Sequence, residues 1–484
     1  MATLFLLLGL GSPALGQQSS LAEHPAVASN LALLEAWIDA QNAYSGVPGV
    51  AVGIVHDQDL IYAKGFGYAD VENEIPCDTN TTFQLASHAK LFIAIAILQL
   101  RDEGKLRLDD PVEQHLPWLS IEATPPDADP ITIWHLLTHS SGLPRDVGSA
   151  FWITHPYPTR EQIIERIKVT RAILPAESRF KYSNVGNFLC GEIISTASHQ
   201  PYADYVASNI LSPLEMNATY VAPETHQRTR MAAGYGRRMP DGSRPRIPFL
   251  EVGGIAPAGG MTSSVADMAK FISWQFRLRK TNTNEVIRSS TLKEMQRVHW
   301  MWPEWNAGSG LGFHILNQPH GVLIGHDGLY AGYKTATYID VERKIGVVVL
   351  TNAMDAEPWP GQPGSITDRI FEWVGPAVES ALSDAAAPVP EAWSALTGTY
   401  RSVLMDLHVL PLDGKLTVVD PTAPNPRQFA LTLEPSGDGG FILDARGPES
   451  GYEPLGERVE FERDSEGRVI ALSMPNDRFE RVSE

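Results

Sequence analysis

The pattern of hydrophobic and polar positions predicts regular elements from the start of the chain. The expected elements are a helix over 26–43, strands over 50–56 and 60–67, and a helix over 87–103. A polar turn at Asp57-Gln58-Asp59 separates the two strands, and Gly104 is well placed to end the second helix. Two neighbouring strands followed by a helix are therefore predicted close to the N-terminal end.

The middle of the chain, about 105–300, has the spacing of helices and loops. Thr159 followed by Gln162, and Ser264 followed by Asp267, are typical of capping boxes that open helices. Strands then return, and they are predicted over 321–324, 333–340 and 345–351. Strands at both ends with helices between them predict an α+β fold, because the βαβ rhythm of a doubly wound sheet is missing. We expect one antiparallel sheet flanked by helices, with an inserted helical subdomain.

The last hundred residues change character. The segment 383–390 is rich in Ala and Pro and is typical of a linker. After it, short apolar segments alternate with turn signals such as Asp413-Gly414, which predicts a small all-β domain, a barrel or a sandwich. We therefore predict a main domain over 17–382, a linker over 383–390 and a C-terminal β-domain over 391–484.

The first residues are typical of an export signal. An apolar run over 4–10 precedes small residues at Ala14 and Gly16, which predicts a signal peptide over 1–16 and a secreted chain. The alternative is a short buried helix. Neither this run nor any later one is long enough to span a membrane. Asn80 and Asn217 lie in sequons and are possible glycosylation sites in a eukaryotic host.

Composition narrows the classes of partner and cofactor. The formal net charge is −19, and such a surface repels nucleic acid and anionic membranes, so neither is expected as a partner. Cys77 and Cys190 are the two cysteines, and the sequence leaves open whether they form a disulfide or stay as buried thiols. We find no C-x-x-C, no H-E-x-x-H and no nucleotide-binding glycine motif, so no metal and no cofactor is predicted.

A lysine in an apolar helix is the first sign of chemistry. The helix is apolar on every face over 91–98 and must be buried, yet Lys90 lies in its first turn. Burial and the helix dipole both favour the neutral amine, which can act as a base. Ser87 precedes it by three residues and lies on the same face. A serine needs such a neighbour to become a nucleophile. The alternative is that Ser87 caps the helix and Lys90 reaches the solvent.

Two further polar groups precede or follow predicted elements. Tyr182 and Asn184 stand just before a predicted helix. Close cations would lower the pKa of Tyr182 and let it relay protons, and Asn184 would bind a substrate carbonyl. The alternative is a packed tyrosine and a helix cap. His326-Asp327-Gly328 follows the strand over 321–324, where the backbone N–H of Leu329 is a candidate ligand donor.

Taken together, S-x-x-K at Ser87, Y-x-N at Tyr182 and a basic residue-x-Gly at His326 form a three-box pattern. In this pattern the chain resembles the penicillin-recognising serine enzymes, in the branch related to class C β-lactamases. That branch includes esterases, D-amino acid peptidases and acyltransferases. The further matching segments are 104–112, 131–144, 257–267, 325–333 and 345–352. The resemblance covers roughly 30–375, and 396–400 resembles the start of the β-domain often appended in this family.

The resemblance implies a role for each candidate. Ser87 would attack the acyl carbon, and Lys90 and Tyr182 would share the acid and base work. Asn184 would hold the substrate carbonyl, and His326 would contact Tyr182 or the leaving group. The backbone N–H groups of Ser87 and Leu329, the latter next to Gly328, would form an oxyanion hole.

Two departures from the family pattern bear on the substrate. The third box has His326 where β-lactamases have lysine, which lowers the expectation of strong β-lactam hydrolysis. Lys334-Thr335 is followed by Ala336 instead of glycine, so we interpret it as part of the next strand and not as the third box. In the first box, Ala89 replaces the usual hydroxyl residue and His88 adds a titratable group beside the nucleophile.

The sequence thus predicts a metal-independent serine hydrolase that forms an acyl-enzyme with a small ester, amide or peptide. An acyltransferase that uses the same site is the first alternative, and a non-catalytic binding protein is the second. The α/β-hydrolase class lacks its G-x-S-x-G signal here, and the zinc lactamases lack H-x-H-x-D-H. The loops over 146–158 and 299–306 are expected to line a partly aromatic cleft.

Overall fold

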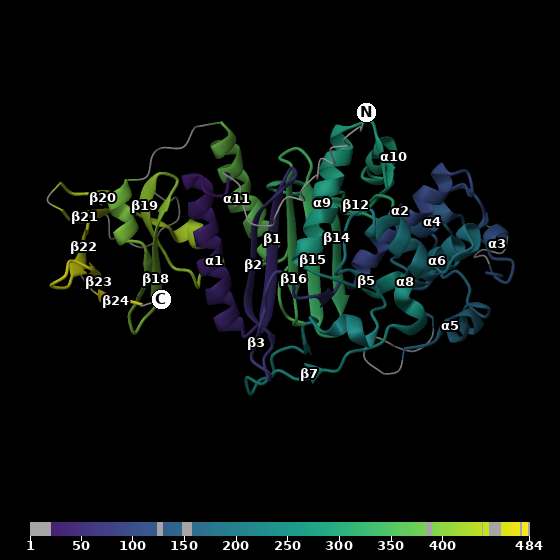
Figure 1. Ribbon diagram of the computed structural model, residues 1–484, viewed down its shortest axis with the longest axis horizontal. Helices are drawn as coiled ribbons and strands as arrows, with labels where there is room; N and C mark the ends of the chain where they lie inside the picture. The colour runs from purple at the N-terminus through teal and green to yellow at the C-terminus, as the bar shows by residue number, and fades with distance from the viewer. Residues whose placement is uncertain are drawn as a thin grey trace, which may run out of the picture.

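A computed structural model of the chain describes residues 21–122, 129–147, 157–383, 390–437, 439–444, 456–474 and 477–482. The predicted signal peptide and most of the predicted linker lie outside the described residues. Figure 1 shows a main domain with a central sheet and, at the left, a separate set of short strands from the C-terminal end.

The main sheet has nine strands, and every neighbouring pair in it is antiparallel. Its strands in spatial order are β11 (Trp300–Met301), β12 (Ala307–Ser309), β13 (His314–Gln318), β14 (Gly321–Tyr330), β15 (Tyr333–Asp340), β16 (Ile345–Thr351), β1 (Gly49–His56), β2 (Asp59–Asp70) and β3 (Ile75–Pro76). Since β1 pairs with β16, segments from both ends of the main domain meet inside one sheet.

Helices cover both faces of this sheet (Figure 1). Alternate residues of β16 separate into two cores: Val347 and Val349 pack with α1 (Pro25–Ser45) and α11 (Ile366–Leu382), whereas Val348 and Leu350 belong to the core with α9 (Val265–Lys280) and α2 (Ala89–Asp102). Burial on both faces explains why β16 is an almost uninterrupted apolar run in the sequence.

The helical region continues from the α2 side of the sheet. Its helices are α3 (Val112–His115), α4 (Ile133–Leu137), α5 (Arg160–Ile167), α6 (Asn184–Ser198), α7 (Tyr202–Val206), α8 (Ala256–Gly259) and α10 (Ser289–Met295). Small two- and three-stranded sheets connect them, formed by β4 (Phe83–Gln84) and β5 (Tyr220–Val221) with β8 (Met261–Ser263), by β6 (Gly234–Tyr235) with β7 (Arg246–Ile247), and by β9 (Asn284–Glu285) with β10 (Ile287–Arg288). No helix in the described part of the chain combines the length and apolar character needed to cross a bilayer.

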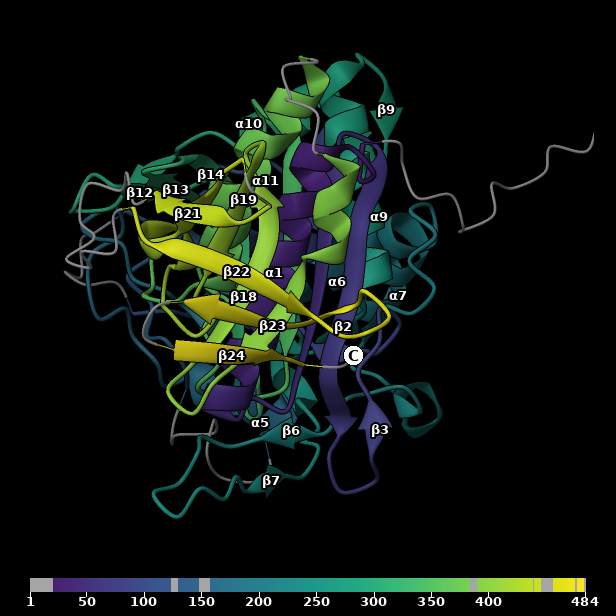
Figure 2. The same cartoon turned by 90° about the vertical axis from the view of Figure 1, so that its left-hand side faces the viewer.

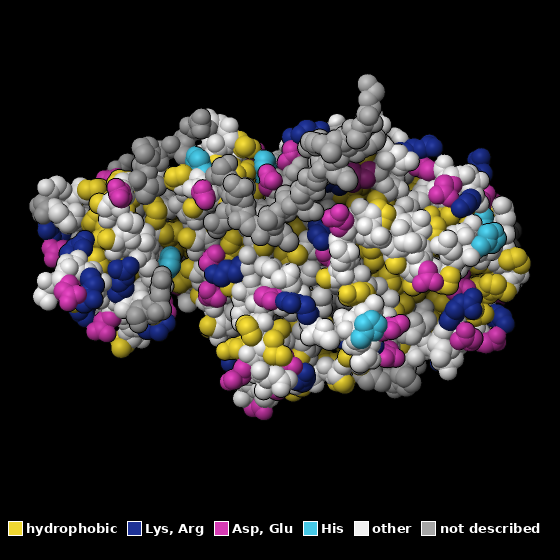
Figure 3. Space-filling model, in the orientation of Figure 1, with side chains coloured by type: hydrophobic (Ala, Val, Ile, Leu, Met, Phe, Trp, Pro, Cys, Tyr) yellow, Lys and Arg dark blue, Asp and Glu magenta, His cyan; other side chains and the backbone are white. Residues whose placement is uncertain are grey.

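The C-terminal strands close into an eight-stranded barrel. They are β17 (Gly398–Arg401), β18 (Asp406–Leu412), β19 (Lys415–Val419), β20 (Leu431–Pro435), β21 (Phe441–Asp444), β22 (Arg458–Arg463), β23 (Val469–Met474) and β24 (Asp477–Arg481). Figure 2 shows the barrel lying against α1 and α11. On β18, Leu407 and Val409 face the barrel core, whereas Leu410 and Leu412 pack into the core of α1 and α11. Figure 3 shows charges of both signs interspersed on one face of the molecule.

The observed architecture confirms the predicted fold class: an antiparallel sheet flanked by helices, an inserted helical subdomain and a small all-β C-terminal domain. Of the predicted capping boxes, Thr159 with Gln162 is reciprocal, whereas Ser264 only accepts from the backbone N–H of Asp267. One strand was predicted too short, because β14 continues beyond Ile324 to Tyr330.

Candidate active site

Ser87 lies on a tight turn between β4 and α2. The turn is a short 3₁₀ segment, Ala86–His88, and Ala86 has a left-handed backbone with φ of 52°. Such a conformation is costly for a residue with a Cβ and is concentrated at functional sites. The N-cap position of α2 is His88 and has no side-chain cap bond, so the Ser87 hydroxyl is not used to cap this helix. The alternative of Ser87 as an N-cap is therefore not what the structure contains.

Lys90 lies in the first turn of α2 with only 2% of its surface exposed. Its Nζ is 3.1 Å from Ser87 Oγ, 3.0 Å from Asn184 Oδ1 and 2.7 Å from the carbonyl oxygen of Ala258. Burial, followed by the positive charge of Arg145, lowers the pKa of Lys90 to about 7. A neutral Lys90 can donate to Asn184 and Ala258 and still accept a proton from Ser87.

Tyr182 approaches the same serine from the other side. Its hydroxyl donates to Ser87 Oγ at 2.7 Å, and the side chain of Ser183, its neighbour, caps α6. The guanidinium of Arg145 lies 5.2 Å from the Tyr182 ring centroid. The expected lowering of the Tyr182 pKa is nevertheless wrong: burial raises it, and this outweighs the cations. Tyr182 is therefore a protonated phenol, a donor and not a resting base.

Asn184 begins α6 and connects the site to the loop before it. Its Oδ1 accepts from Lys90, and its Nδ2 donates to Asp146 Oδ1 at 2.9 Å. One amide hydrogen is left over, because an Asn NH₂ group has two. Its use to bind a substrate carbonyl stays a prediction.

The third predicted box lies inside strand β14 and not after it. His326 is 1% exposed, and its ring centroid is 6.4 Å from that of Tyr182. A Cβ placed on Gly328 would lie 2.1 Å from the carbonyl oxygen of Leu85, so glycine lets β14 approach the turn that carries Ser87. The Leu329 side chain is 40% exposed, and the role of its N–H in an oxyanion hole stays a prediction.

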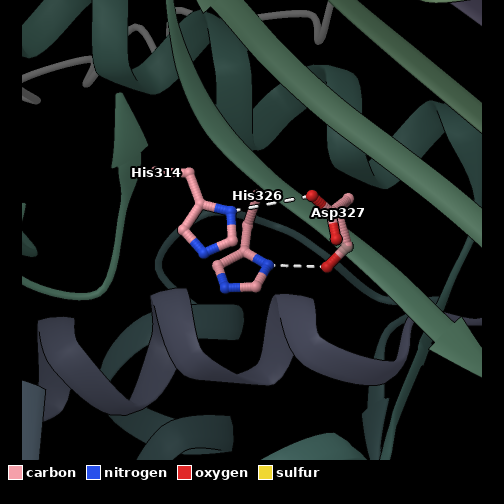
Figure 4. A group of neighbouring side chains, drawn as sticks. All are labelled: His314, His326 and Asp327. Carbon is pink, nitrogen blue, oxygen red and sulfur yellow. Dashed lines mark hydrogen bonds and ion pairs between the residues drawn. The ribbon is translucent and has the colours of Figure 1, made fainter. Parts of the chain in front are cut away.

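A second histidine packs on His326 (Figure 4). The rings of His314 and His326 are stacked with centroids 4.0 Å apart, and His314 Nδ1 lies 3.6 Å from Asp327 Oδ2. His326 Nδ1 is 2.6 Å from the backbone carbonyl of Asp327, which can only accept, so Nδ1 carries the proton and Nε2 a lone pair. Burial holds the pKa of His326 well below its usual range, and the ring is neutral.

These three residues, His314, His326 and Asp327, are also the group within the described residues that best resembles a metal site, with potential ligand atoms within 4.8 Å of one another. The lone pair of an imidazole lies in the plane of its ring. Two rings stacked at 26° direct their lone pairs along nearly parallel planes, a poor arrangement for one shared ion. The geometry favours a hydrogen-bonded cluster.

The departures from the family pattern have structural explanations. His88 is fully buried, its Nδ1 is 2.9 Å from the carbonyl oxygen of Leu85, and burial lowers its pKa to about 4, so it carries no charge at neutral pH. Lys334 points away from the site and forms an ion pair with Glu357 at 3.1 Å. Thr335, one position along β15, faces the site and contacts the turn at Leu85 and His88.

Sequence reasoning missed several residues of the site. Arg145, Asp146 and His314 belong to no predicted motif, although Asp146 begins the loop over 146–158 that was expected to line the cleft and of which 148–156 lie outside the described residues. His139 lies in the matching segment 131–144, but no role was predicted for it. His139 stacks on Tyr182 with centroids 4.3 Å apart. Away from the site, Cys77 and Cys190 are buried free thiols, which decides the open alternative against a disulfide. Asn80 and Asn217 are both exposed, and their glycosylation stays a prediction.

The chain matches a family model described as Beta-lactamase over residues 34–367. This chain belongs to the Beta-lactamase family. The match includes all three boxes and every residue discussed above as a candidate for catalysis, and it confirms the resemblance found in the sequence. Members of this family are serine hydrolases, and their relatives include penicillin-binding proteins and D-amino acid amidases.

Among Beta-lactamase family relatives, Protein flp of Staphylococcus aureus (strain MW2) is 28% identical over 63% of this chain, which spans 60% of that relative's length. The octameric penicillin-binding protein homologue from Pyrococcus abyssi has a TM-score of 0.63 and 26% identity, covering 93% of this chain and 99% of its own. The D-amino acid amidase from Ochrobactrum anthropi SV3 complexed with D-phenylalanine has a TM-score of 0.59 and 25% identity, covering 74% and 99%.

Proposed function

We propose that this chain hydrolyses an ester or amide bond of a small molecule or peptide through an acyl-enzyme on Ser87. One observation carries the proposal: Ser87 Oγ lies within hydrogen-bond distance of both Lys90 Nζ and Tyr182 OH, at 3.1 Å and 2.7 Å. A base and an acid are thus in contact with one nucleophile, as covalent catalysis requires.

The pKa shifts divide the two roles. Lys90, with a pKa of about 7, is unprotonated in a large fraction of molecules at neutral pH and is the base that takes the proton of Ser87. Tyr182, whose pKa is raised by burial, keeps its proton and is the acid. The Ser87 Oγ–carbon bond forms as the Ser87 proton moves to Lys90, and the bond to the leaving group breaks as Tyr182 protonates that group. The proton on Lys90 then restores Tyr182.

The remaining residues bind the reacting carbonyl. The free hydrogen of the Asn184 amide donates to it, and the backbone N–H groups of Ser87 and Leu329 stabilise the oxyanion. Each such donor typically lowers the barrier by about 2.7–4 kcal/mol. Water then attacks the acyl-enzyme as Lys90 takes its proton, and Tyr182 protonates Ser87 Oγ as the acyl group leaves; transfer of the proton from Lys90 to Tyr182 restores both groups. Secretion with a signal peptide over 1–16 belongs to the same proposal and rests on the sequence.

The proposal is tested by intact-mass spectrometry after brief incubation with p-nitrophenyl acetate and, separately, with a penicillin. We expect a mass increase that is absent in Ser87→Ala and retained in Ser208→Ala, a matched control at an exposed serine. An adduct that persists in Ser87→Ala, or no adduct and no turnover with either reagent, would refute the proposal. Adding an alcohol to the acetyl-enzyme separates hydrolysis from acyl transfer.

A further inference from the structure

Tyr182 belongs to a group of five rings in which each ring contacts the next and the last contacts the first. The distances between ring centroids are 4.3 Å for Tyr182 and His139, 5.8 Å for His139 and Phe180, and 4.8 Å for Phe180 and Trp302. They are 5.4 Å for Trp302 and His314, and 6.5 Å for His314 and Tyr182. One histidine ring therefore separates Phe180, and another separates Trp302, from Tyr182, whose hydroxyl contacts Ser87.

The two outer rings come from different parts of the fold. Phe180 precedes Tyr182 by two positions in an irregular segment, and both contact His139, so they lie on the same side. Trp302 follows β11 at the edge of the main sheet. Its Nε1 donates to Ser309 Oγ at 3.1 Å, and this bond helps to fix the orientation of the indole. Both rings are only partly buried, so part of each is open to solvent.

Large apolar rings that are held in place near the proposed acid Tyr182 and left partly uncovered are suited to bind an apolar group. Aromatic pairs are favourable beyond the area they bury, and a fixed indole loses little conformational entropy on binding. The neighbouring Tyr182 is the acid for the leaving group in the proposed function, on which this inference rests. The part of the substrate next to Tyr182 is therefore its alcohol or amine side.

We infer that Phe180 and Trp302 form a platform that binds an aromatic leaving group, so that the preferred substrates are esters or amides of arylalkyl alcohols or amines. In this inference the two rings select the alcohol or amine part of the substrate and do not contact its acyl group. This inference names a substrate class and two specificity residues, neither of which takes part in bond breaking.

Three esters separate the two sides of the substrate: benzyl acetate, ethyl acetate and ethyl phenylacetate. The two acetates form the same acetyl-enzyme, and the third carries its ring on the acyl side. We expect the full chain to prefer benzyl acetate over ethyl acetate in kcat/KM. Trp302→Leu should lower kcat/KM for benzyl acetate about tenfold, because the benzyl ring loses its contact with the indole and the apolar area buried there. The loss in kcat/KM for ethyl acetate should be much smaller, and Trp302→Phe should restore most of the preference.

Trp305→Leu is the matched control, because Trp305 is in the same loop, 78% exposed, and should change none of the three values. If Trp302→Leu lowers kcat/KM for ethyl phenylacetate and not for benzyl acetate, the rings bind the acyl side and the inference is overturned. An equal loss with all three esters shows a structural role and also overturns it. Failure of the proposed function is recognised separately, because then no ester is turned over and Ser87 forms no adduct.

Discussion

At the scale of single residues, the site depends on how burial acts on two titratable groups. The same desolvation lowers the pKa of Lys90 to about 7 and raises that of Tyr182, so that a base and an acid exist side by side at neutral pH. The pair Ser87 and Lys90 was predictable because an apolar helix must bury a lysine in its first turn. Tyr182, Asn184 and His326 were predictable only with the family pattern. His314 and Asp146 were not predictable, because their contacts join segments distant in the sequence.

The acylation rate should follow the titration of Lys90. The base is its neutral form, whose fraction grows with pH, so the rate with a neutral ester should rise between about pH 5 and pH 9 with a midpoint near 7. Stopped-flow measurement of alcohol release with excess enzyme gives this profile. Tyr182→Phe should slow the reaction and keep the midpoint. A profile that is flat over this range would assign the base to another group.

The same lysine links folding stability to pH. Its pKa is lower in the folded chain than in the unfolded chain, so between about pH 7 and its usual pKa the unfolded chain binds more protons. The free energy of unfolding of the natural chain should therefore rise relative to Lys90→Met by about 1.4 kcal/mol per pH unit in this window. Denaturant titrations at several pH values measure the difference, and a constant difference would contradict the lowered pKa.

At the scale of elements, local pattern predicted the central strands and missed the edges. Strands β1 and β16 are largely apolar on both faces, β15 alternates apolar and polar residues, and all three stand out in the sequence. The second half of β14 was missed because polar His326 and Asp327 interrupt it, and β11 and β12 because they have two and three residues. Such strands are fixed by pairing with neighbours, which local propensity does not contain.

Strand β14 also explains the glycine of the third box. Gly328→Ala would place a Cβ against the carbonyl oxygen of Leu85 and push the strand away from the turn at Ser87. We expect a loss of roughly 1–3 kcal/mol in stability, as for other overpacked sites, together with a large loss of kcat. Gly186→Ala is the control, because its nearest neighbour would be at an ordinary 3.6 Å. Full activity of Gly328→Ala would show that the close approach is not needed.

At the scale of the whole molecule, the barrel and the main domain share one hydrophobic cluster. Leu410, Leu412 and Val419 of the barrel belong to the core formed with α1 and α11. The Trp37 Nε1 of α1 donates to the carbonyl oxygen of Ala423 at 3.1 Å, and Arg427 Nη1 donates to Asn30 Oδ1 at 3.1 Å. The sequence predicted the all-β domain from its turns, but not that two of its strands, β18 and β19, contribute to both cores.

This shared core predicts that the two domains unfold together. Leu410→Ala should cost about 2–5 kcal/mol, as for other buried leucines, and lower the Tm of a single calorimetric transition. Leu404→Ala, at a position 79% exposed, should change stability by less than about 0.5 kcal/mol. Two separate transitions, of which only one responds to Leu410→Ala, would show that the barrel folds independently.

The central position of β1 has a consequence for biosynthesis. Its first residue, Gly49, donates to Asn352 across 303 positions of the chain, so β1 has no partner on that side until almost the whole main domain has left the ribosome. At about 5–20 residues per second, this largely apolar strand is synthesised roughly 15–60 s before its partner β16. During that time the nascent chain exposes hydrophobic surface and an unpaired strand edge, which favour aggregation. We therefore expect the yield of folded protein to depend on the supply of chaperones during translation more than on the stability of the finished fold.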